Sequence, residues 1–331
     1  CRKNLKNLKN GLLFIKFYAM IVFVPGCGSA WLERRLGEAG VASSNPAAPT
    51  TNSRKVVQAT TFLFSAAVTE EFSMACILFP SPIFGPVHSR RLGTSLGINL
   101  LPAEAKVCSF DCVYCECGFN KDHDAKRKLP TREEVRTALE KKLIYLQKTG
   151  VVPDVFTFAG NGEPTSHPDF YLIIDDTIEL RDRYFPNAKI SVLSNSTFLA
   201  RDRVVKALAK VDNPIMKLDT VNADYIRRID RPNAKYDVKE VIEKLKNMPV
   251  RPIIQTMFMK GEFEGQSVDN TIDEFVNPWI DVLEEIKPRE VMIYTLDRDT
   301  PAAGLKKADK ESLCKIRDKL EKRGFRVMVS V

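Results

Sequence analysis

The residues best suited to chemistry are three cysteines in the sequence Cys108-Ser-Phe-Asp-Cys112-Val-Tyr-Cys115, spaced as C-x3-C-x2-C. Four of the chain's eight cysteines lie within residues 108–117, and clustering of this kind usually indicates a metal site. Three thiolates on one loop can converge on one face of an iron–sulfur cubane and leave the fourth iron open. An open metal position is reactive, as at catalytic zinc sites. A zinc knuckle and redox-active thiols are the alternatives.

The other cysteines fit such a site less well. Cys117 is too near Cys115 in the chain to complete a zinc knuckle with standard geometry, so we expect a spare thiol beside the site or an accessory ligand. Cys76 and Cys314 are single and distant in the sequence, and buried structural thiols are the usual outcome for such residues. Because only Cys314 follows Cys117, a second full cluster is not expected.

Polar residues also follow several predicted strands where each strand ends. The segment Ala159-Gly160-Asn161-Gly162-Glu163-Pro164 follows the strand over 154–159, and Ser194-Asn195-Ser196 follows the strand over 189–193. Glycines let the backbone approach a ligand closely, and a carboxylate can accept hydrogen bonds from an ammonium group. A plain turn is the alternative for the first segment, and a helix cap is the alternative for the second.

Further candidates carry weaker signals. Lys217 and Asp219 end the fourth strand and could contact substrate or cofactor, or form an ordinary ion pair. The fifth strand contains two polar residues that could face a pocket, Gln255 and Thr256. His167 has no companion His or Cys, so we expect a loop or cap residue.

Two charged segments lie before the first predicted strand and after the sixth. His88, Arg90 and Arg91 form a small basic patch before the first predicted strand, and it could bind a cofactor, a substrate anion or RNA, or simply be solvated. The sixth strand leads into Asp297 and Arg298, and we expect Arg298 to face a carboxylate or phosphate and to help close the site.

These residues must be positioned by alternating strands and helices. From Met74 onward the pattern predicts helices near 131–146, 168–178, 199–210, 238–247, 272–286 and 309–322, between apolar strands at 95–101, 154–159, 189–193, 214–218, 252–258, 290–295 and 325–330. Continuous apolar strands are typical of a parallel sheet that is buried on both faces. A doubly wound sheet and a complete or partial barrel both place active-site groups at the carboxyl ends of the strands.

Composition excludes several classes of protein. The 331 residues are 44% hydrophobic and 28% charged, which is typical of a globular chain and not of a disordered or fibrous one. No stretch reaches the roughly 18 apolar residues of a membrane span. The net charge is +8, of which residues 1–73 contribute +5 and the remainder +3, so charge alone does not indicate a nucleic-acid partner.

Residues 1–73 do not follow the pattern of the rest of the chain. The basic start, the apolar stretch 11–24 and Cys27 permit a lipoprotein signal, whereas the Ser-Asn-Pro at 44–46 resembles a mistranslated tRNA gene. We favour an upstream misread with the true start at Met74 over a signal peptide or a disordered extension. We therefore divide the chain into a non-core segment, 1–73, and a core domain, 74–331.

The cysteine spacing, with an aromatic residue directly before the last cysteine, resembles the signature of the radical S-adenosylmethionine (radical SAM) superfamily. The segments Gly85–Gly93 and Ser95–Asn99 resemble the opening of a subgroup related to the wyosine-type tRNA-modifying enzymes. The resemblance covers roughly residues 84–331 and implies an α/β fold, a partial (β/α)6 TIM-type barrel.

The resemblance also implies cofactors and their ligands. Cys108, Cys112 and Cys115 would hold a four-iron four-sulfur (4Fe-4S) cluster, and S-adenosylmethionine would chelate its fourth iron. One electron would then cleave the cofactor and yield a 5′-deoxyadenosyl radical that abstracts hydrogen from a substrate. The same likeness assigns Tyr114 to the adenine, Gly160, Gly162 and Glu163 to the methionine amino group, and Ser194 and Asn195 to the ribose hydroxyls or the carboxylate. Asn161 is inserted relative to the shortest form of the glycine motif.

The expected function is therefore that of a radical enzyme acting on a small molecule or an RNA base, with an electron donor such as flavodoxin or ferredoxin and no membrane partner. A glycyl-radical activase and a metal-binding protein without turnover are the alternatives. The family's tRNA enzymes carry more basic surface and further cysteines, so tRNA as substrate is only an analogy. An oxygen-labile cluster would suit the cytoplasm of a cell with little oxygen.

Overall fold

Eight strands form the main sheet in the part of the chain that the computed structural model describes, residues 77–122 and 128–331. In sheet order the strands are β1 (Ile83–Ser89), β2 (Gly93–Ile98), β3 (Val155–Phe158), β4 (Lys189–Ser194), β5 (Asn213–Lys217), β6 (Ile253–Met257), β9 (Glu290–Tyr294) and β11 (Val327–Ser330). β1 pairs antiparallel with β2, and every other pair is parallel. The predicted boundary after residue 73 lies outside the described residues.

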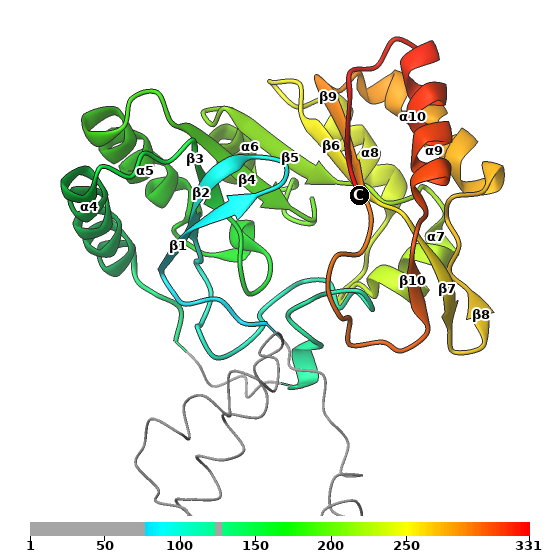
Figure 1. Ribbon diagram of the computed structural model, residues 1–331, viewed down its shortest axis with the longest axis horizontal. Coiled ribbons are helices and arrows are strands. Elements are labelled where there is room, and N and C mark those ends of the chain that lie inside the picture. Colours follow the sequence, from blue (N-terminus) through cyan, green and yellow to red (C-terminus); the bar gives the residue numbers. More distant parts are fainter. Residues whose placement is uncertain (1–76, 123–127) are drawn as a thin grey trace, which may run out of the picture. The chain divides into compact units, whose positions relative to one another are not determined.

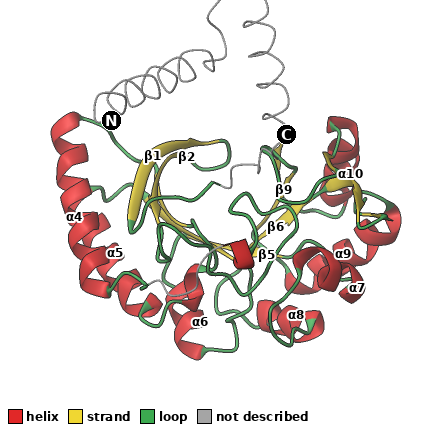
Figure 2. Ribbon diagram, turned by 90° about the horizontal axis from the view of Figure 1, so that it is seen from below, coloured by secondary structure: helices red, strands yellow, loops and turns green. Residues whose placement is uncertain are grey.

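The sheet is curled, and its helices lie on the convex face (Figures 1 and 2). These helices are α4 (Arg132–Thr149), α5 (Phe170–Tyr184), α6 (Asp202–Leu208), α8 (Val238–Lys246), α9 (Asp273–Ile286) and α10 (Lys310–Lys322). A doubly wound sheet would carry helices on both faces and reverse its strand order. Here the parallel strands follow chain order, so the predicted partial barrel is confirmed.

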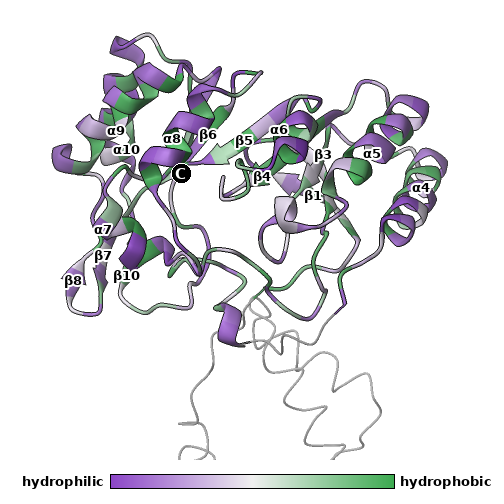
Figure 3. Ribbon diagram, turned by 180° about the vertical axis from the view of Figure 1, so that it is seen from behind, coloured by the Kyte–Doolittle hydropathy of each residue, from purple (hydrophilic) through white to green (hydrophobic). Residues whose placement is uncertain are grey.

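The amphipathic pattern places the main core between the sheet and these helices. In α4 the buried residues recur at helical spacing and are Val135, Leu139, Leu143 and Leu146. Figure 3 shows hydrophilic and hydrophobic residues on different sides of α4 and α5. A capping box joins Thr131 and Glu134 at the start of α4, and Gly150 ends the helix in the left-handed conformation with φ 73°. No described helix is long and apolar enough to cross a bilayer.

Some elements differ from the sequence prediction. β1 was not expected, because Gly85 and Pro86 disfavour a strand; an irregularity in the register between Phe84 and Val87 accommodates them. A small sheet of β10 (Leu305–Lys307), β7 (Met259–Phe263) and β8 (Gln266–Ser267) was also missed. The helix predicted from 199 begins at Asp202, and α5 begins at Phe170, so Pro168 lies before its first turn.

Candidate functional site

All nine residues singled out as cluster or cofactor ligands line one cavity of about 250 Å³, which we call the thiol cavity. Cys108, Cys112, Tyr114 and Cys115 reach it from the loop of residues 106–118, here called the cysteine loop. The other five reach it from the segments that follow β3 and β4, and they are Gly160, Gly162, Glu163, Ser194 and Asn195. Parallel strands thus bring residues far apart in the sequence to one edge of the sheet.

Backbone hydrogen bonds fix the cysteine loop against the π-helical turn Ile226–Asp230. The Asp111 amide donates to the Asp230 carbonyl at 3.0 Å, and the Val113 amide donates to the Ile229 carbonyl at 2.9 Å. The Asn120 side chain accepts from the Cys108 amide at 3.2 Å and donates to the carbonyls of Cys108 and Phe110. A π-helical turn often marks a functional site, and sequence periodicity gave no signal for this one.

The glycines of the segment after β3 line the thiol cavity and also allow close packing within the protein. A Cβ on Gly162 would lie 1.9 Å from the Val107 carbonyl oxygen, and one on Gly160 would lie 2.7 Å from the Asn99 side chain. Their φ values of 138° and 135° also disfavour other residues. Gly162 therefore lets the cysteine loop reach the end of β3, where Val107 donates to the Asn161 carbonyl at 2.8 Å.

Asn161, inserted in the glycine motif, is fully buried and has a structural role. Its side-chain oxygen accepts from the Phe79 amide at 2.8 Å, and its side-chain nitrogen donates to the Phe79 and Pro102 carbonyls at 2.9 and 2.8 Å. These bonds hold the segment before β1 and the loop after β2 to the end of β3.

Glu163 is 2% exposed, so its alternative interpretation as a solvated turn residue is wrong. Oε1 accepts hydrogen bonds from the Thr165 amide at 3.0 Å, the Thr165 hydroxyl at 2.5 Å and the Ser194 hydroxyl at 2.9 Å. Oε2 accepts one from the Asn195 amide at 2.6 Å. Burial raises the pKa of this carboxyl although these donors oppose the shift. Glu163 therefore joins the segments after β3 and β4 at the cavity wall.

Ser194 and Asn195 do not cap a helix, since α6 begins only at Asp202. Their side chains instead form hydrogen bonds with Glu163 and Ser109. The Ser194 hydroxyl donates to Glu163. The Asn195 side-chain amide donates to the Ser109 hydroxyl at 2.9 Å and lies 3.6 Å from the Cys108 sulfur. The segment after β4 therefore contacts both the buried carboxylate and the first cysteine.

The three thiols differ in acidity. Burial raises the pKa of Cys108 to about 12 and that of Cys112 well above its ordinary value. A hydrogen bond with the Cys117 side chain lowers the pKa of Cys115 to about 6, with help from the Lys106 ammonium. The Cys117 thiol itself is buried and lies 3.5 Å from the Gly160 carbonyl oxygen. Cys115 is thus the thiol most readily deprotonated.

Lys106 is a buried cation that the sequence did not single out. Its ammonium donates to the Gly118 carbonyl at 2.7 Å and contacts Asp111 at 3.3 Å. Burial alone would lower its pKa, but the neighbouring thiols of the three cysteines raise it. A buried ammonium needs such partners, and the attraction favours thiolates at this loop.

Lys217, which lines the thiol cavity, and Asp219 belong to a buried network of charged side chains. The sequence left open whether these two residues contact a ligand or form an ion pair. The Lys217 ammonium lies 2.6 Å from Asp219 and 2.5 Å from Asp230, and the Tyr114 hydroxyl donates to Asp219. Burial raises the pKa of Asp230 to about 6, against the pull of Lys217. The ion pair predicted as one alternative is present, and Tyr114 is a buried aromatic that also lines the cavity.

Most of the weaker candidates have structural roles or lie away from the thiol cavity. Thr256 is buried and donates to the Leu218 carbonyl at 2.8 Å, so it does not line the thiol cavity, whereas Gln255 does. His167 is buried between the Pro130 carbonyl at 2.9 Å and the Asp169 amide at 3.1 Å, as expected of a loop residue. Cys314 lies on α10 as a half-buried free thiol, and Cys76 lies outside the described residues.

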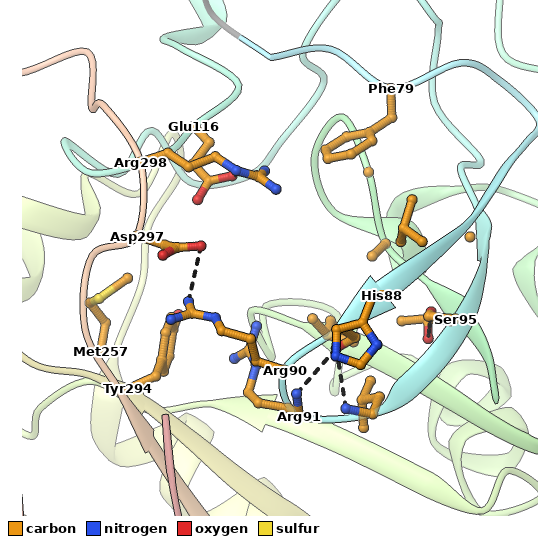
Figure 4. Close-up of a pocket in the computed structure, with 18 of the residues that line it drawn as sticks. Phe79, His88, Arg90, Arg91, Ser95, Glu116, Met257, Tyr294, Asp297 and Arg298 are labelled. Carbon is orange, nitrogen blue, oxygen red and sulfur yellow. Dashed lines mark hydrogen bonds and ion pairs between the residues drawn. The ribbon is translucent and has the colours of Figure 1, made fainter. Parts of the chain in front are cut away.

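A second cavity, of about 340 Å³, continues from the thiol cavity and is walled by the β1–β2 hairpin (Figure 4). We call it the hairpin cavity. Tyr114, Gly160 and Tyr294 line both cavities. Arg298 faces a carboxylate as predicted, that of Glu116 at 2.7 Å, and Asp297 pairs with Arg90 at 3.2 Å. The basic patch of His88, Arg90 and Arg91 therefore lines a cavity and does not precede the sheet.

Within residues 77–122 and 128–331, no three His, Cys, Asp or Glu side chains are arranged around a point that could hold one metal ion. A four-iron cluster takes its thiolates at separate corners, so three thiols around one cavity suit its donor set.

Comparison with known proteins agrees with this donor set. The family model described as the Radical SAM superfamily matches residues 105–275. A UPF0026 protein of Methanocaldococcus jannaschii is 30% identical over 244 residues, which cover 70% of this chain and 69% of that protein. A protein named GTPase Obg, of Brachyspira hyodysenteriae, is 28% identical over 72% of this chain, which spans only 33% of that protein.

The fold also resembles a solved structure. A radical SAM methyltransferase from Sphaerobacter thermophilus superposes with a TM-score of 0.54 at 16% identity, and the match covers 71% of this chain and 65% of that one. At this identity the likeness concerns the fold, a curled sheet with helices outside.

Proposed function

Because the chain belongs to the radical SAM superfamily and to the UPF0026 family, we propose that it is an enzyme that holds a 4Fe-4S cluster and S-adenosylmethionine in the thiol cavity. One observation carries the proposal: the three cysteines of the C-x3-C-x2-C motif share one cavity with the carboxyl ends of β3 and β4. When bound, the cluster and S-adenosylmethionine supply a 5′-deoxyadenosyl radical that abstracts hydrogen from a substrate.

The chain's own residues prepare Cys115 to bind iron as a thiolate. Cys115 has a pKa of about 6 because Cys117 donates a hydrogen bond to it, so it is the first of the three to lose its proton. The buried Lys106 ammonium offsets the negative charge that builds up as Cys108 and Cys112 follow. Of the proposed iron ligands, Cys112 is buried, and Cys108 and Cys115 are half-buried.

Glu163 is suited to receive the ammonium group of S-adenosylmethionine. Each carboxylate oxygen can accept about two hydrogen bonds, and the described residues give Oε2 one donor, the Asn195 amide. The remaining acceptor site would face the thiol cavity, which Glu163 lines. Ser194 and Asn195 then serve as positioning residues, since the one orients the carboxylate and the other contacts the Cys108 sulfur.

Tyr114 is suited to lie beside the adenine. Its ring borders both cavities, and its hydroxyl is held by Asp219. The adenosyl group would then point toward the hairpin cavity, where the substrate is expected. The segment that resembles the wyosine-type enzymes forms the β1–β2 hairpin along this cavity, so the resemblance concerns the substrate side. The electron would come from a small carrier such as flavodoxin or ferredoxin.

The test is replacement of each motif cysteine by Ala, followed by anaerobic reconstitution with iron and sulfide. Cys108→Ala, Cys112→Ala and Cys115→Ala should each lose the cluster's visible absorption and its 5′-deoxyadenosine formation. The matched control is Cys314→Ala, which removes a half-buried thiol on α10 and should keep both. Full iron content in any of the three motif variants would overturn the assignment.

A further inference from the structure

Arg91 lies in the turn of the β1–β2 hairpin and lines the hairpin cavity. Its Nη1 is buried and has no hydrogen-bond partner among the described residues. The guanidinium lies over the Tyr294 ring, 4.5 Å from the ring centre, which fixes its plane at the cavity wall (Figure 4). A buried donor without a partner costs free energy, and Arg91 carries such a donor at the wall of a cavity large enough for a ligand.

The other two arginines of the hairpin cavity are already paired. Arg90 reaches Asp297 at 3.2 Å with Nη2 and donates to the Val331 carbonyl at 2.7 Å with Nη1. Arg298 reaches Glu116 at 2.7 Å. No such ion pair joins Arg91 to a carboxylate of the residues that the structure describes. The uncompensated charge of this cavity is therefore that of Arg91.

We propose that Arg91 binds an oxyanion group, a carboxylate or a phosphate, of a small-molecule substrate that occupies the hairpin cavity. The inference rests on the proposed function, since it concerns the substrate of the same site. A planar guanidinium offers a fork of donors that matches such groups. The cavity of about 340 Å³ has the size of a small-molecule site.

Arg91 is placed to serve a substrate rather than S-adenosylmethionine. It lines the hairpin cavity and does not line the thiol cavity. Tyr294, which lines both cavities, lies under its guanidinium. An anion held by Arg91 would therefore fix one end of a substrate while its other end faces the shared wall of Tyr114 and Gly160.

The chain offers a matched control for this residue. Arg228 also has a buried Nη1 without a partner among the described residues, and its guanidinium lies 5.9 Å from the centre of the Tyr225 ring. Arg228 donates to the Ser267 carbonyl at 2.8 Å and lines neither cavity. Arg228→Gln therefore removes a similar arginine without touching the proposed substrate site.

The test is calorimetric titration of two probes, inorganic phosphate and succinate, into the cluster-loaded protein saturated with S-adenosylmethionine, at constant ionic strength. We expect at least one probe to bind, and Arg91→Gln to weaken its affinity about tenfold or more, the loss typical of one charged hydrogen bond. Arg228→Gln should match the parent within about twofold, because Arg228 does not line the hairpin cavity. The preferred probe tells phosphate from carboxylate.

Arg91→Lys keeps a charge but loses the fork, so its affinity should fall between those of the parent and Arg91→Gln. Arg91→Lys also provides the test if Arg91→Gln does not fold. Absence of binding by both probes to the parent, or equal affinity in the parent and both Arg91 variants, would overturn the inference. If the parent still forms 5′-deoxyadenosine in that case, the proposed function stands and only the oxyanion site is lost.

Discussion

Glu163 is held in a network of hydrogen bonds within the protein and also borders the thiol cavity. Four donors from Thr165, Ser194 and Asn195 hold its carboxylate, and this network connects two strand ends. The same carboxylate borders the thiol cavity, where the proposed ammonium contact would be made. A mutation here therefore affects both the wall of the cavity and the proposed cofactor contact.

Glu163→Gln should separate iron binding from cofactor binding. Loss of a charged hydrogen bond costs about 1.5–3 kcal/mol, so the affinity for S-adenosylmethionine should fall roughly 10- to 150-fold. The melting temperature should also fall, because an amide nitrogen would face the donors of Thr165 or Asn195. Iron content should stay normal, since the thiols are unchanged. Titration of the cofactor, followed by the cluster's electron paramagnetic resonance signal, measures the effect.

The control for this variant is Glu133→Gln, which neutralises an exposed carboxylate in the first turn of α4. It should bind S-adenosylmethionine within about twofold of the parent, since surface changes are usually small. An unchanged affinity in Glu163→Gln would remove this residue from the proposed ligands and leave it a structural one.

At the scale of elements, the cysteine loop depends on close contact with the segment after β3. Gly162→Ala should weaken this contact, because its Cβ would lie 1.9 Å from the Val107 carbonyl oxygen. Backbone atoms cannot yield as a flexible side chain would, so the loop must shift. We expect lower thermal stability and incomplete cluster loading, measured by iron content after reconstitution.

Gly150→Ala is the matched control for that variant. Gly150 also has a positive φ, 73°, but its Cβ would meet nothing within 4 Å. It should cost about 1 kcal/mol of stability for the backbone conformation alone and should load the cluster fully. Normal loading in Gly162→Ala would show that the loop tolerates displacement from β3.

Helices α4 and α5 are joined by a charged clamp. Arg132 donates two hydrogen bonds of 2.7 Å to Asp176, and Arg136 donates a third at 3.1 Å. The hydrogen bonds from Arg132 hold the pKa of Asp176 below its ordinary value of 3.8. This carboxylate therefore stabilises the folded state above pH 3.8, and the contribution is lost as the pH falls through the lowered pKa.

Asp176→Asn should reduce the free energy of unfolding at pH 7 by about 1–2 kcal/mol. This value lies below that of a fully buried charged pair, because Arg132 is partly exposed to solvent. The difference from the parent should narrow as the pH falls below the ordinary pKa of 3.8. Urea denaturation at several pH values measures it. Asp175→Asn, which breaks the exposed pair with Lys210, should stay within about 0.5 kcal/mol. A difference that does not change with pH would refute the clamp's ionic character.

At the scale of the whole described unit, the helices cover only the convex face of the curled sheet (Figure 2). On the concave side, the turn between β1 and β2 contacts the segments after β9 and β11. Arg90 connects this turn to Asp297 after β9 and to Val331 after β11. The concave side therefore contains two connected cavities, one at the cysteines and one at the hairpin. Under the proposed function, this arrangement would let a reactive group in one cavity meet a substrate in the other.

Binding of S-adenosylmethionine should stabilise the whole described unit. At 100 times the dissociation constant, a ligand that binds only the folded state adds about 2.7 kcal/mol. For a domain of this size that corresponds to a rise in melting temperature of roughly 5–10 °C. Anaerobic differential scanning fluorimetry of the cluster-loaded protein measures it. The Cys108→Ala variant should show little shift, and an equal shift in both proteins would place the cofactor away from the cysteines.

The sequence by itself determined the alternation of strands and helices, the buried face of α4 and the residues that line the thiol cavity. These are local properties: apolar periodicity marks buried faces, and parallel strands bring their carboxyl ends together in any fold of this class. Together with the resemblance to the radical SAM superfamily, this rule predicted that Cys108, Gly160 and Ser194, far apart in the chain, would lie at one site.

Only the tertiary structure decided what these residues contact. Gly162 accommodates the Val107 carbonyl, and Glu163 accepts four hydrogen bonds from the protein. The charge of Lys106 helps to lower the pKa of Cys115. The β1–β2 hairpin that presents Arg91 escaped prediction because Gly85 and Pro86 disfavour a strand locally. Contacts between distant segments depend on packing, and no local pattern encodes which backbone atom a glycine must admit or which charge a cavity leaves unpaired.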